Sequence, residues 1–583
     1  MQQPLPFATR SIAGLGILVA IGLMAVPTGH AAWTPDGVAV ATIDGDQFHP
    51  AIVHDGTGGA IIVWRDDRSG GVAIYAQRLD ADGNPMWTGN GILVCTVTWV
   101  SVYPVAVSDG LGGAYIIWSD SRGGGNPNDH LYAQRIGADG SKYWAPGGVE
   151  VCPGGGGQFY PTAITDFRPQ VGLNTNGCIV VFENAGTNSF TLFAQRLDMN
   201  GSRLWGSGGV SLCSTAADGY AAITPDGTAT TFFSSGAIVA WKTGASDIRA
   251  NWINATGVVQ WGADGLAICT ATGEQKNPAI AGVGPRRAII GWEDNRSGDG
   301  GDIYAQQVDN GAVSWTPDGV VVADPPGIQD GPQVAPAPSG AFITWSDGRD
   351  PDKPLNLDIY AQRVDLNGVS QWTADGIPVC GSGGYQTRSR VTPDFVGGIY
   401  VVWVDGREDH YDLRAQRADG DGNLAWDPEG VVVSGAAGDQ DFPELIVYGE
   451  FLFLAWEDTR NSVNGFDIYA GRITSGGTVA VSESPIQSVP VGAFLVQLLS
   501  SNPQHGETRF GVDLREGSRV GAEVCDVTGR RVWKLGEVAL TPGSHVLRWD
   551  GRDLSGQAVP SGVYFMRVES GERSSVLKLV RAR

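Results

Sequence analysis

Two short groups of acidic and histidine residues are the parts of this sequence that could carry chemistry. The first group is Asp129 with His130, and the second is Glu408, Asp409 and His410. Carboxylate and imidazole side chains can ligate a metal ion or exchange protons with a substrate. Solvated polar loop residues are the commoner origin of such groups. The five positions are therefore candidate ligand-binding residues, with an ordinary loop as the alternative.

Motifs that would indicate a cofactor or a known reaction are weak or absent. The sequence has no His-Glu-x-x-His, Gly-x-Ser-x-Gly or Gly-x-x-x-x-Gly-Lys-Ser/Thr motif, so we predict no catalytic residue. Two acidic turns hint at Ca²⁺ but lack the long loop and closing glutamate of an EF-hand, so we expect no cofactor, with Ca²⁺ as a weak alternative. These turns contain Asp80 and Asp82, and Asp419, Asp421 and Asn423.

The composition indicates a globular, turn-rich protein. The chain has 583 residues, of which 85 are glycine and 19 are tryptophan, and 42% of the residues are hydrophobic. Glycine without a Gly-X-Y period excludes collagen, and the hydrophobic content excludes a disordered chain. The formal net charge of −23 repels phosphate backbones, so nucleic acid is not an expected partner.

Residues 1–32 have the features of a secretory signal peptide. Arg10 precedes an apolar run over residues 11–26, and the small residues Gly29 and Ala31 follow. We expect cleavage near Ala31. An uncleaved membrane anchor is the alternative, but the run is shorter than the roughly 20 residues that a bilayer requires, and no later stretch is apolar enough to span one.

Tryptophan recurs in two columns, and the first column is spaced by 54 to 61 residues. The first column is Trp33, Trp87, Trp144, Trp205, Trp261, Trp315, Trp372 and Trp426. The second column is Trp64, Trp118, Phe182, Trp241, Trp292, Trp345, Trp403 and Trp456. A repeat of this length is typical of solenoids and propellers.

Each repeat predicts four short strands, the pattern of one β-propeller blade. In the first repeat we expect strands at Pro50, before Trp64, around residues 75–78 and after Trp87. The last repeat lacks a fourth strand, and residues 33–41 form an orphan fourth strand at the start. We therefore predict a closed, eight-bladed β-propeller over residues 33–473. Residues 478–481 could compete for the closing place, and an open β-solenoid is the rival architecture.

Residues present in nearly every repeat are expected to build the blades, because catalysis needs one constellation rather than eight copies. This applies to the second tryptophan column and to the Asp-x-Arg pair that follows it, such as Asp66 and Arg68. The pair begins the most variable loop of the repeat, between the second and third strands. Recognition commonly uses variable loops on a rigid scaffold, so the face with these loops is the predicted binding face. The seven cysteines fall largely on repeat positions, which predicts buried free thiols.

The C-terminal part of the chain lacks the tryptophan repeat. Residues 474–493 are rich in serine, glycine, proline and valine, which predicts a linker. About seven short alternating segments follow in residues 494–583. This pattern predicts an immunoglobulin-like β-sandwich, although the Cys-Trp-Cys signature is missing.

An ordered set of motifs in this segment resembles a known family. Its landmarks are Asp526, Gly529, Trp549, Asp550, Gly551, Gly562 and Tyr564. The segment resembles the C-terminal sorting domain of type A substrates of the type IX secretion system, which is itself similar to the immunoglobulin-like domain of the flagellar hook-capping proteins. The resemblance implies the type IX machinery as a partner and export across the outer membrane of a Gram-negative bacterium. The chain departs from the family at residues 580–583, where members often have a lysine-rich run.

Three functions are compatible with these features. The leading hypothesis is a secreted or surface-displayed binding protein whose propeller recognises an extracellular glycan or protein. The first alternative is a secreted hydrolase or lyase, which predicts a deep axial pocket with at least two acidic residues of shifted pKa. The second alternative is a structural surface-layer protein that assembles with itself.

Overall fold

The structure of the chain is a computed structural model that describes residues 33–479 and 494–581. Short gaps interrupt these ranges at residues 69, 98–102, 123–128, 154–156, 167–168, 171–172, 175–176, 186–189, 219–220, 228–235, 299, 351–355, 382, 395, 450, 462–464, 499–507, 515–517, 527–529, 541–542, 555 and 571–572. The predicted signal peptide, Gly529 and most of the predicted linker lie outside the described residues. Every regular element within them is a β-strand, which confirms the all-β expectation. Among the described residues no helix is long and apolar enough to cross a membrane.

The first complete sheet shows how each repeat folds. It consists of β2 (Gln47–His54), β3 (Ala60–Asp66), β4 (Ala73–Leu79) and β5 (Ile92–Thr96), which pair antiparallel in this order. The run from Ala60 to Trp64 is buried throughout because β3 has a neighbouring strand on each edge and a neighbouring sheet on each face. A strand buried on both faces is apolar along its whole length rather than alternating.

Seven further sheets of the same form occur in the described residues. The next three are β6 (Val105–Ser108), β7 (Ala114–Asp120), β8 (His130–Ile136) and β9 (Val149–Glu150); β10 (Gln158–Asp166), β13 (Gly177–Ala185), β14 (Phe190–Leu197) and β15 (Val210–Ser211); and β16 (Ala222–Pro225), β17 (Ala237–Lys242), β18 (Ile248–Ile253) and β19 (Leu266–Cys269). The small pair β11 (Pro169–Gln170) and β12 (Leu173–Asn174) lies between β10 and β13 in the chain.

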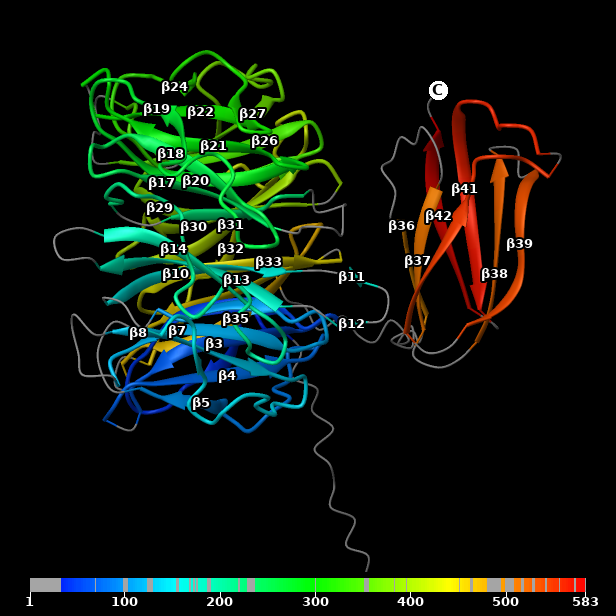
Figure 1. Cartoon of the computed structure of the whole chain (residues 1–583), viewed down its shortest axis with the longest axis horizontal. Coiled ribbons are helices and arrows are strands. Elements are labelled where there is room, and N and C mark those ends of the chain that lie inside the picture. Colours follow the sequence, from blue (N-terminus) through cyan, green and yellow to red (C-terminus); the bar gives the residue numbers. More distant parts are fainter. Residues whose placement is uncertain are drawn as a thin grey trace, which may run out of the picture.

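The remaining four complete the series. They are β20 (Gln275–Gly284), β21 (Arg287–Asp294), β22 (Asp302–Asp309) and β24 (Val320–Ala323), with β23 (Ala312–Val313) also on β22; β25 (Gln329–Ala337), β26 (Gly340–Asp347), β27 (Asp358–Asp365) and β28 (Ile377–Cys380); β29 (Tyr385–Pro393), β30 (Ile399–Gly406), β31 (Asp412–Ala418) and β32 (Val431–Ser434); and β33 (Gln440–Tyr448), β34 (Phe451–Asp458), β35 (Asp467–Thr474) and β1 (Val38–Ala41). Figure 1 shows these sheets following one another in chain order, from blue through green to yellow.

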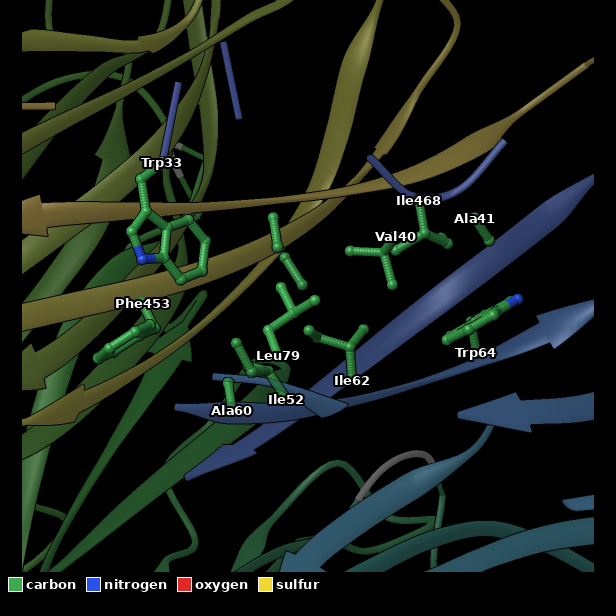
Figure 2. Packing of buried hydrophobic residues seen from close by; sticks show 12 residues of the cluster. Trp33, Val40, Ala41, Ile52, Ala60, Ile62, Trp64, Leu79, Phe453 and Ile468 are labelled. Atoms are coloured by element: carbon green, nitrogen blue, oxygen red, sulfur yellow. The ribbon is translucent and has the colours of Figure 1, made fainter. Parts of the chain in front are cut away.

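The two ends of the repeat region meet in one sheet. The strand β1 pairs antiparallel with β35, with Val38 opposite Ala470. The first strand of each sheet contacts the first strands of the sheets before and after it, and β33 contacts β2. Figure 2 shows the hydrophobic cluster at this junction, where Val40 and Ile468 pack with Ile62. An open solenoid would leave these ends apart, so the structure supports the β-propeller.

A repeated polar unit explains the second tryptophan column and the Asp-x-Arg pair. In the first sheet, Trp64 Nε1 donates to Asp66 Oδ2 at 2.8 Å, and Arg68 Nη2 donates to the same oxygen at 2.6 Å. The Arg68 guanidinium lies 3.9 Å from the ring centre of Tyr75 and donates to the carbonyl of Asn90 at 2.8 Å. We call this the Trp-Asp-Arg-Tyr unit. It ties the second strand to the third strand and to the turn before the fourth.

The first tryptophan column links neighbouring sheets. Trp87 Nε1 donates to the carbonyl of Ala138, which belongs to a turn of the next sheet, at 3.2 Å. Arg78 donates to the same carbonyl at 2.9 Å. Trp33 makes the equivalent bond to Ala81 at 2.9 Å, so the N-terminal segment takes part in the same linkage.

The same type of hydrogen bond extends the propeller beyond its predicted end at residue 473. The carbonyl of Ser475 accepts hydrogen bonds from Trp426 Nε1 at 3.2 Å and from Arg417 Nη1 at 3.3 Å. Thr474 is the last residue of β35, and Val479 forms a bridge with Ile473. Residues 474–479 are therefore the closing turn of the propeller, and the expectation that the linker begins at residue 474 is wrong.

The cysteines are free thiols, as predicted. Six of the seven are buried, and Cys525 is half-buried. Several lie beside the Trp-Asp-Arg-Tyr unit of the following sheet: Arg122 Nη2 lies 3.2 Å from Cys95 Sγ, and Arg296 Nη2 lies 3.2 Å from Cys269 Sγ. Cysteine at this position is a small, buried group that also accepts a weak hydrogen bond.

The C-terminal residues form two antiparallel sheets. One has the strand order β36 (Phe494–Leu498), β37 (Thr508–Leu514) and β40 (Gly543–Trp549), and the other has the order β39 (Arg531–Leu540), β38 (Ser518–Asp526), β41 (Gly562–Ser570) and β42 (Arg573–Arg581). One apolar cluster with residues of both sheets, including Phe510, Trp549 and Met566, fills this part of the chain. Tyr564 donates its hydroxyl to the carbonyl of Pro560 at 2.8 Å, and its ring lies edge-on to Trp549.

The Trp-Asp-Arg-Tyr unit predicts how much one tryptophan contributes to stability. Trp345 is fully buried and donates to Asp347 at 2.7 Å. Trp345→Ala is expected to lower the free energy of unfolding by about 3–5 kcal/mol, because it leaves a cavity. Trp345→Phe keeps most of the ring but leaves the buried carboxylate short of a donor, at a cost of about 1–3 kcal/mol. Urea unfolding of the full chain measures both, with the exposed Tyr143→Ala as control. Equal stability of Trp345→Phe and the wild type would contradict the role of the hydrogen bond.

Candidate functional site

The two ends of the sheets carry different kinds of connection. Because the strands are antiparallel, the loop from the second to the third strand lies at the same end as the connection to the next sheet. Hydrogen bonds between sheets agree with this: Gln47 N donates to Phe466 O and Gln440 N donates to Tyr411 O, both at 2.7 Å. Each bond joins the start of a first strand to a second-to-third-strand loop of the preceding sheet. We call this end of the propeller the loop end.

Asp129 and His130 lie at the loop end. His130 is the first residue of β8, and its Nδ1 lies 2.5 Å from Glu150 Oε1 on β9. Asp129 accepts a hydrogen bond from the Ser121 hydroxyl, and its carbonyl accepts from Gln158 N at 2.7 Å. Both residues therefore hold the loop to its own sheet and to the next one.

Glu408, Asp409 and His410 occupy a different loop at the same end. They lie between β30 and β31, where Glu408 and Asp409 are exposed and His410 Nε2 lies 3.2 Å from Asp412 Oδ1. The described contacts of the two predicted groups stay within their own sheet or the next one. The structure therefore does not bring the five residues into one constellation.

The acidic turns that hinted at Ca²⁺ lie at the opposite end. Asp80 Oδ1 accepts the backbone N–H groups of Asp82 and Asn84 at 2.9 Å each, and Asp419 Oδ1 accepts those of the equivalent residues Asp421 and Asn423. These carboxylates thus stabilise their own turns. Within the described parts of the chain, no three histidine, cysteine or acidic side chains are grouped so that they could hold a metal ion.

The first strands carry a feature that the sequence patterns did not indicate. Each of six first strands has a β-bulge, because its register with the second strand shifts near the start: β2, β10, β20, β25, β29 and β33. The bulged residue has a left-handed backbone, and it is His49 (φ 52°), Tyr160 (48°), Asn277 (53°), Gly331 (61°), Arg388 (53°) or Phe442 (50°). The β-bulge recurs in these six sheets, but the residue type at the bulged position differs from sheet to sheet. Bulges often redirect side chains beside functional sites.

Three of these positions and Tyr103 form a continuous row. The Arg388 guanidinium lies 4.3 Å from the ring centre of Phe442. The Phe442 ring lies edge-on to His49 at 5.7 Å, and the His49 ring lies 4.3 Å from that of Tyr103, which precedes Pro104 at the equivalent place of the next sheet. We call Arg388, Phe442, His49 and Tyr103 the stacking row. It is contributed by four successive sheets at the loop end.

The stacking row is open to solvent. Tyr103 is 44% exposed, Phe442 is 36% exposed and the Arg388 side chain is 45% exposed. Arg388 also forms an ion pair with Asp441. Large aromatic side chains that stay exposed in contact with one another mark a binding surface more often than scattered apolar residues do.

A buried carboxylate supports the row from below. Glu457 is 2% exposed, and its Oε1 accepts the backbone N–H of His49 at 2.7 Å. Burial raises the pKa of Glu457 to about 7, and the nearby charges of Asp441 and Asp46 add to this effect. Burial and the Arg65 charge lower the pKa of His49. Glu457 therefore changes its ionisation close to neutral pH, where His49 is mostly neutral.

Further buried or half-buried carboxylates occupy related positions in other sheets. Burial and the Asp218 charge raise the pKa of Glu183 to about 7. Burial and the Glu293 charge raise the pKa of Asp330 to about 6, while Glu293 itself pairs with Lys276 at 2.8 Å. Glu183, Glu293 and Glu457 all directly follow the second-column aromatic residue. This position varies between repeats, whereas the next residue is Asp in six of the eight.

A signal for the row was present in the sequence. The proline that opens most repeats marks the bulge, and the residue before it changes from repeat to repeat: His49, Tyr103, Tyr160, Asn277, Gly331 and Phe442. The proline itself predicted a strand, whereas the signal for the row lay in the residue before it. Contact between these neighbours depends on ring closure, which brings sheets from both ends of the repeat region together.

A hollow of about 370 Å³ lies on the C-terminal sheet that contains β38 and β39. Its lining includes charged side chains that pair with one another, such as Arg519 with Glu537 at 3.6 Å and Arg567 with Glu569 at 3.0 Å. Because these charges already have partners, we assign no ligand to this hollow.

Comparisons with known proteins give similarity of structure only. No protein-family model matches the chain, and no curated protein matches its sequence. A puromycin hydrolase is similar over 70% of this chain and 58% of its own length, with 13% identity and a TM-score of 0.36. The BP39L lectin from Burkholderia pseudomallei is similar over 64% of this chain and 94% of its own, with 14% identity and a TM-score of 0.38. An α-L-arabinanase from Penicillium chrysogenum is similar over 54% and 93%, with 12% identity and a TM-score of 0.32. Similarities at this level assign no activity to the chain.

The raised pKa of Glu457 predicts a specific pH dependence of stability. Between its ordinary value of 4.5 and about 7, the folded protein keeps the proton that the unfolded chain has released. The free energy of unfolding therefore falls as the pH rises through this window. Glu457→Gln removes this loss, so its stability relative to the wild type is expected to grow with pH by up to about 3 kcal/mol.

Denaturant unfolding of the full chain at pH 4.5, 6 and 8 checks this prediction. Glu408→Gln, on an exposed loop, is the matched control and should follow the wild type at each pH. A stability difference between Glu457→Gln and the wild type that stays constant with pH would contradict the prediction.

Proposed function

We propose that the eight four-stranded sheets are the blades of one closed propeller and that an immunoglobulin-like sandwich follows it. Contacts between consecutive first strands and the pairing of β1 with β35 support the ring. Two sheets of three and four strands around one apolar cluster support the sandwich. The ring holds the variable positions of the first strands on a rigid frame.

The proposed function is recognition of an extracellular ligand, a glycan or a protein, at the loop end of the propeller. The observation that carries it is the stacking row, in which exposed Tyr103, Phe442 and Arg388 and half-buried His49 form one chain of contacts. Aromatic residues and arginine dominate binding energy at interfaces because they offer large, stiff contact surfaces. The left-handed backbone of the bulges costs of order 1–3 kcal/mol at each non-glycine residue, which favours a purpose beyond packing.

The proposal also covers export. A signal peptide over residues 1–32 and a type IX sorting domain at the C-terminus would place the mature chain outside the cell or on the outer-membrane surface. The described landmarks Trp549 and Tyr564 pack in the core of the sandwich, and Asp550 caps the following turn by accepting from Arg552 N at 3.0 Å. These contacts support a folded module, and the loss of surface display after removal of residues 494–583 would test its role.

Ligand capture by the full chain tests the binding function. A glycan array and a pull-down from extracellular material should both be run with the wild type, Phe442→Ala and Tyr103→Ala. Each row variant is expected to weaken binding about tenfold or more, because each loses one ring of the contact surface. Tyr143→Ala, an exposed aromatic at the opposite end, is the control and should bind normally.

Other outcomes would favour other sites or functions. If His130→Ala or His410→Ala abolishes binding while the row variants bind normally, the variable loops and not the row form the site. Self-assembly without capture of any ligand would support a structural surface-layer role.

A second candidate function is a hydrolase or lyase, and one observation favours it. Asp441 and Glu457 lie opposite each other on β33 and β34, where Asp441 pairs with Arg388 and the pKa of Glu457 is raised to about 7. A carboxyl group of raised pKa beside a second carboxyl group is a combination that acid–base catalysis uses. Glu457 is covered by His49, so a substrate would reach it only after His49 moves, and this function ranks second.

Release of reducing ends or unsaturated products from polysaccharides by the full chain tests this candidate. Activity that disappears in both Glu457→Gln and Asp441→Asn, and persists in Glu408→Gln, is the expected result for an enzyme. Equal activity in all three variants would assign the catalysis to other residues.

A further inference from the structure

We infer that the ligand of the stacking row is an uncharged saccharide chain, whose sugar rings stack on Tyr103, His49 and Phe442. This inference rests on the proposed binding function and names the chemistry of its ligand. Three features of the row carry it: the orientation of its rings, the pairing of its charges and the protection of the strand edges beside it.

The rings present several faces along a curved path. The planes of His49 and Tyr103 are inclined by 38°, and those of His49 and Phe442 by 89°. A single flat aromatic ligand cannot lie against all three rings. A chain of sugar rings joined by flexible linkages can, because each ring follows the local surface. The C–H groups on a sugar face carry partial positive charge, which complements the negative face of an aromatic ring.

The charges at the row are already paired within the protein. Arg388 pairs with Asp441, and Arg65, behind the row, pairs with Asp67 at 2.8 Å. A strongly charged ligand would have to displace one of these partners, and a polyanion would also meet the net charge of −23. Paired charges at the surface still accept and donate hydrogen bonds, so Arg388 and Asp441 suit the hydroxyl groups of a neutral sugar.

A peptide that adds as a strand to the first-strand edge is disfavoured. Pro50 and Pro443 directly follow His49 and Phe442, and proline has no N–H to donate to an added strand. The β-bulges at the same positions also break the regular spacing of hydrogen-bonding groups. The side chains of the row, and not the backbone beneath them, are therefore the binding surface.

Affinity electrophoresis of the full chain in native gels tests the inference. The gels contain soluble arabinan, arabinoxylan, galactomannan or mixed-linkage β-glucan as neutral probes, and alginate as an anionic probe. We expect retardation by at least one neutral probe and none by alginate. Phe442→Ala and Tyr103→Ala should each raise the apparent dissociation constant about tenfold, with Tyr143→Ala unchanged.

Further variants separate stacking from folding. Phe442→Tyr keeps a ring at the same place and should retain binding within about threefold, which shows that loss in Phe442→Ala is not due to misfolding. Retardation by alginate alone, equal retardation of the wild type and Phe442→Ala, or no retardation by any neutral probe would overturn the saccharide inference. If a protein partner is captured through the row in the pull-down but no neutral probe retards the chain, the binding function stands and only the saccharide inference fails.

Discussion

The burial of a carboxyl group in six of the eight sheets is the constraint on which the rest of the propeller depends. Asp66, Asp294, Asp347, Asp405 and Asp458 are fully or almost fully buried. A buried charge is tolerated only when opposite charge and hydrogen bonds surround it. The Trp-Asp-Arg-Tyr unit supplies both, and the need for each partner explains why tryptophan, aspartate and arginine recur together. The unit also requires glycine at position 91, because a Cβ atom there would lie 2.4 Å from the Trp64 ring. The φ angle of Gly91, +82°, likewise favours glycine.

The same unit connects one sheet to the next, which frees other positions to vary. The arginine reaches the outer strand of the preceding sheet, where Cys95, Cys269, Cys380 or Ser434 accepts from it. Trp33, Trp87 and five more tryptophans of the first column bond to turns of the following sheet. The start of the first strand joins the sheets as well, as in the bond from Gln47 N to Phe466 O. The bulged position two residues later holds a different residue type in each of the six sheets that have it. Differences between repeats are concentrated there.

The stacking row lies across the closing seam of the ring. Phe442 belongs to the sheet that β1 completes, His49 belongs to the first sheet in the chain, and the two rings touch. Glu457 bonds across the same seam to the His49 backbone. Closure and the candidate site are thus coupled: Phe442 and His49 are in contact only when the two ends of the repeat region have come together. A binding surface at this seam exists only in the fully folded propeller.

The sequence by itself determined the all-β class, the repeat and the residues that build it. Those features depend on local patterns that recur. A pattern repeated eight times can be recognised in the sequence without knowledge of the distances between residues in space. The sequence also indicated the loop residues Asp129, His130 and Glu408–His410 as candidate ligand-binding residues. Their residue types alone do not distinguish binding of a ligand from hydrogen bonding within their own loop. Only the tertiary structure decided that His130 pairs with Glu150 and His410 with Asp412. It also brought Arg388, Phe442, His49 and Tyr103 together, because residues more than three hundred positions apart in the chain become neighbours only when the ring closes.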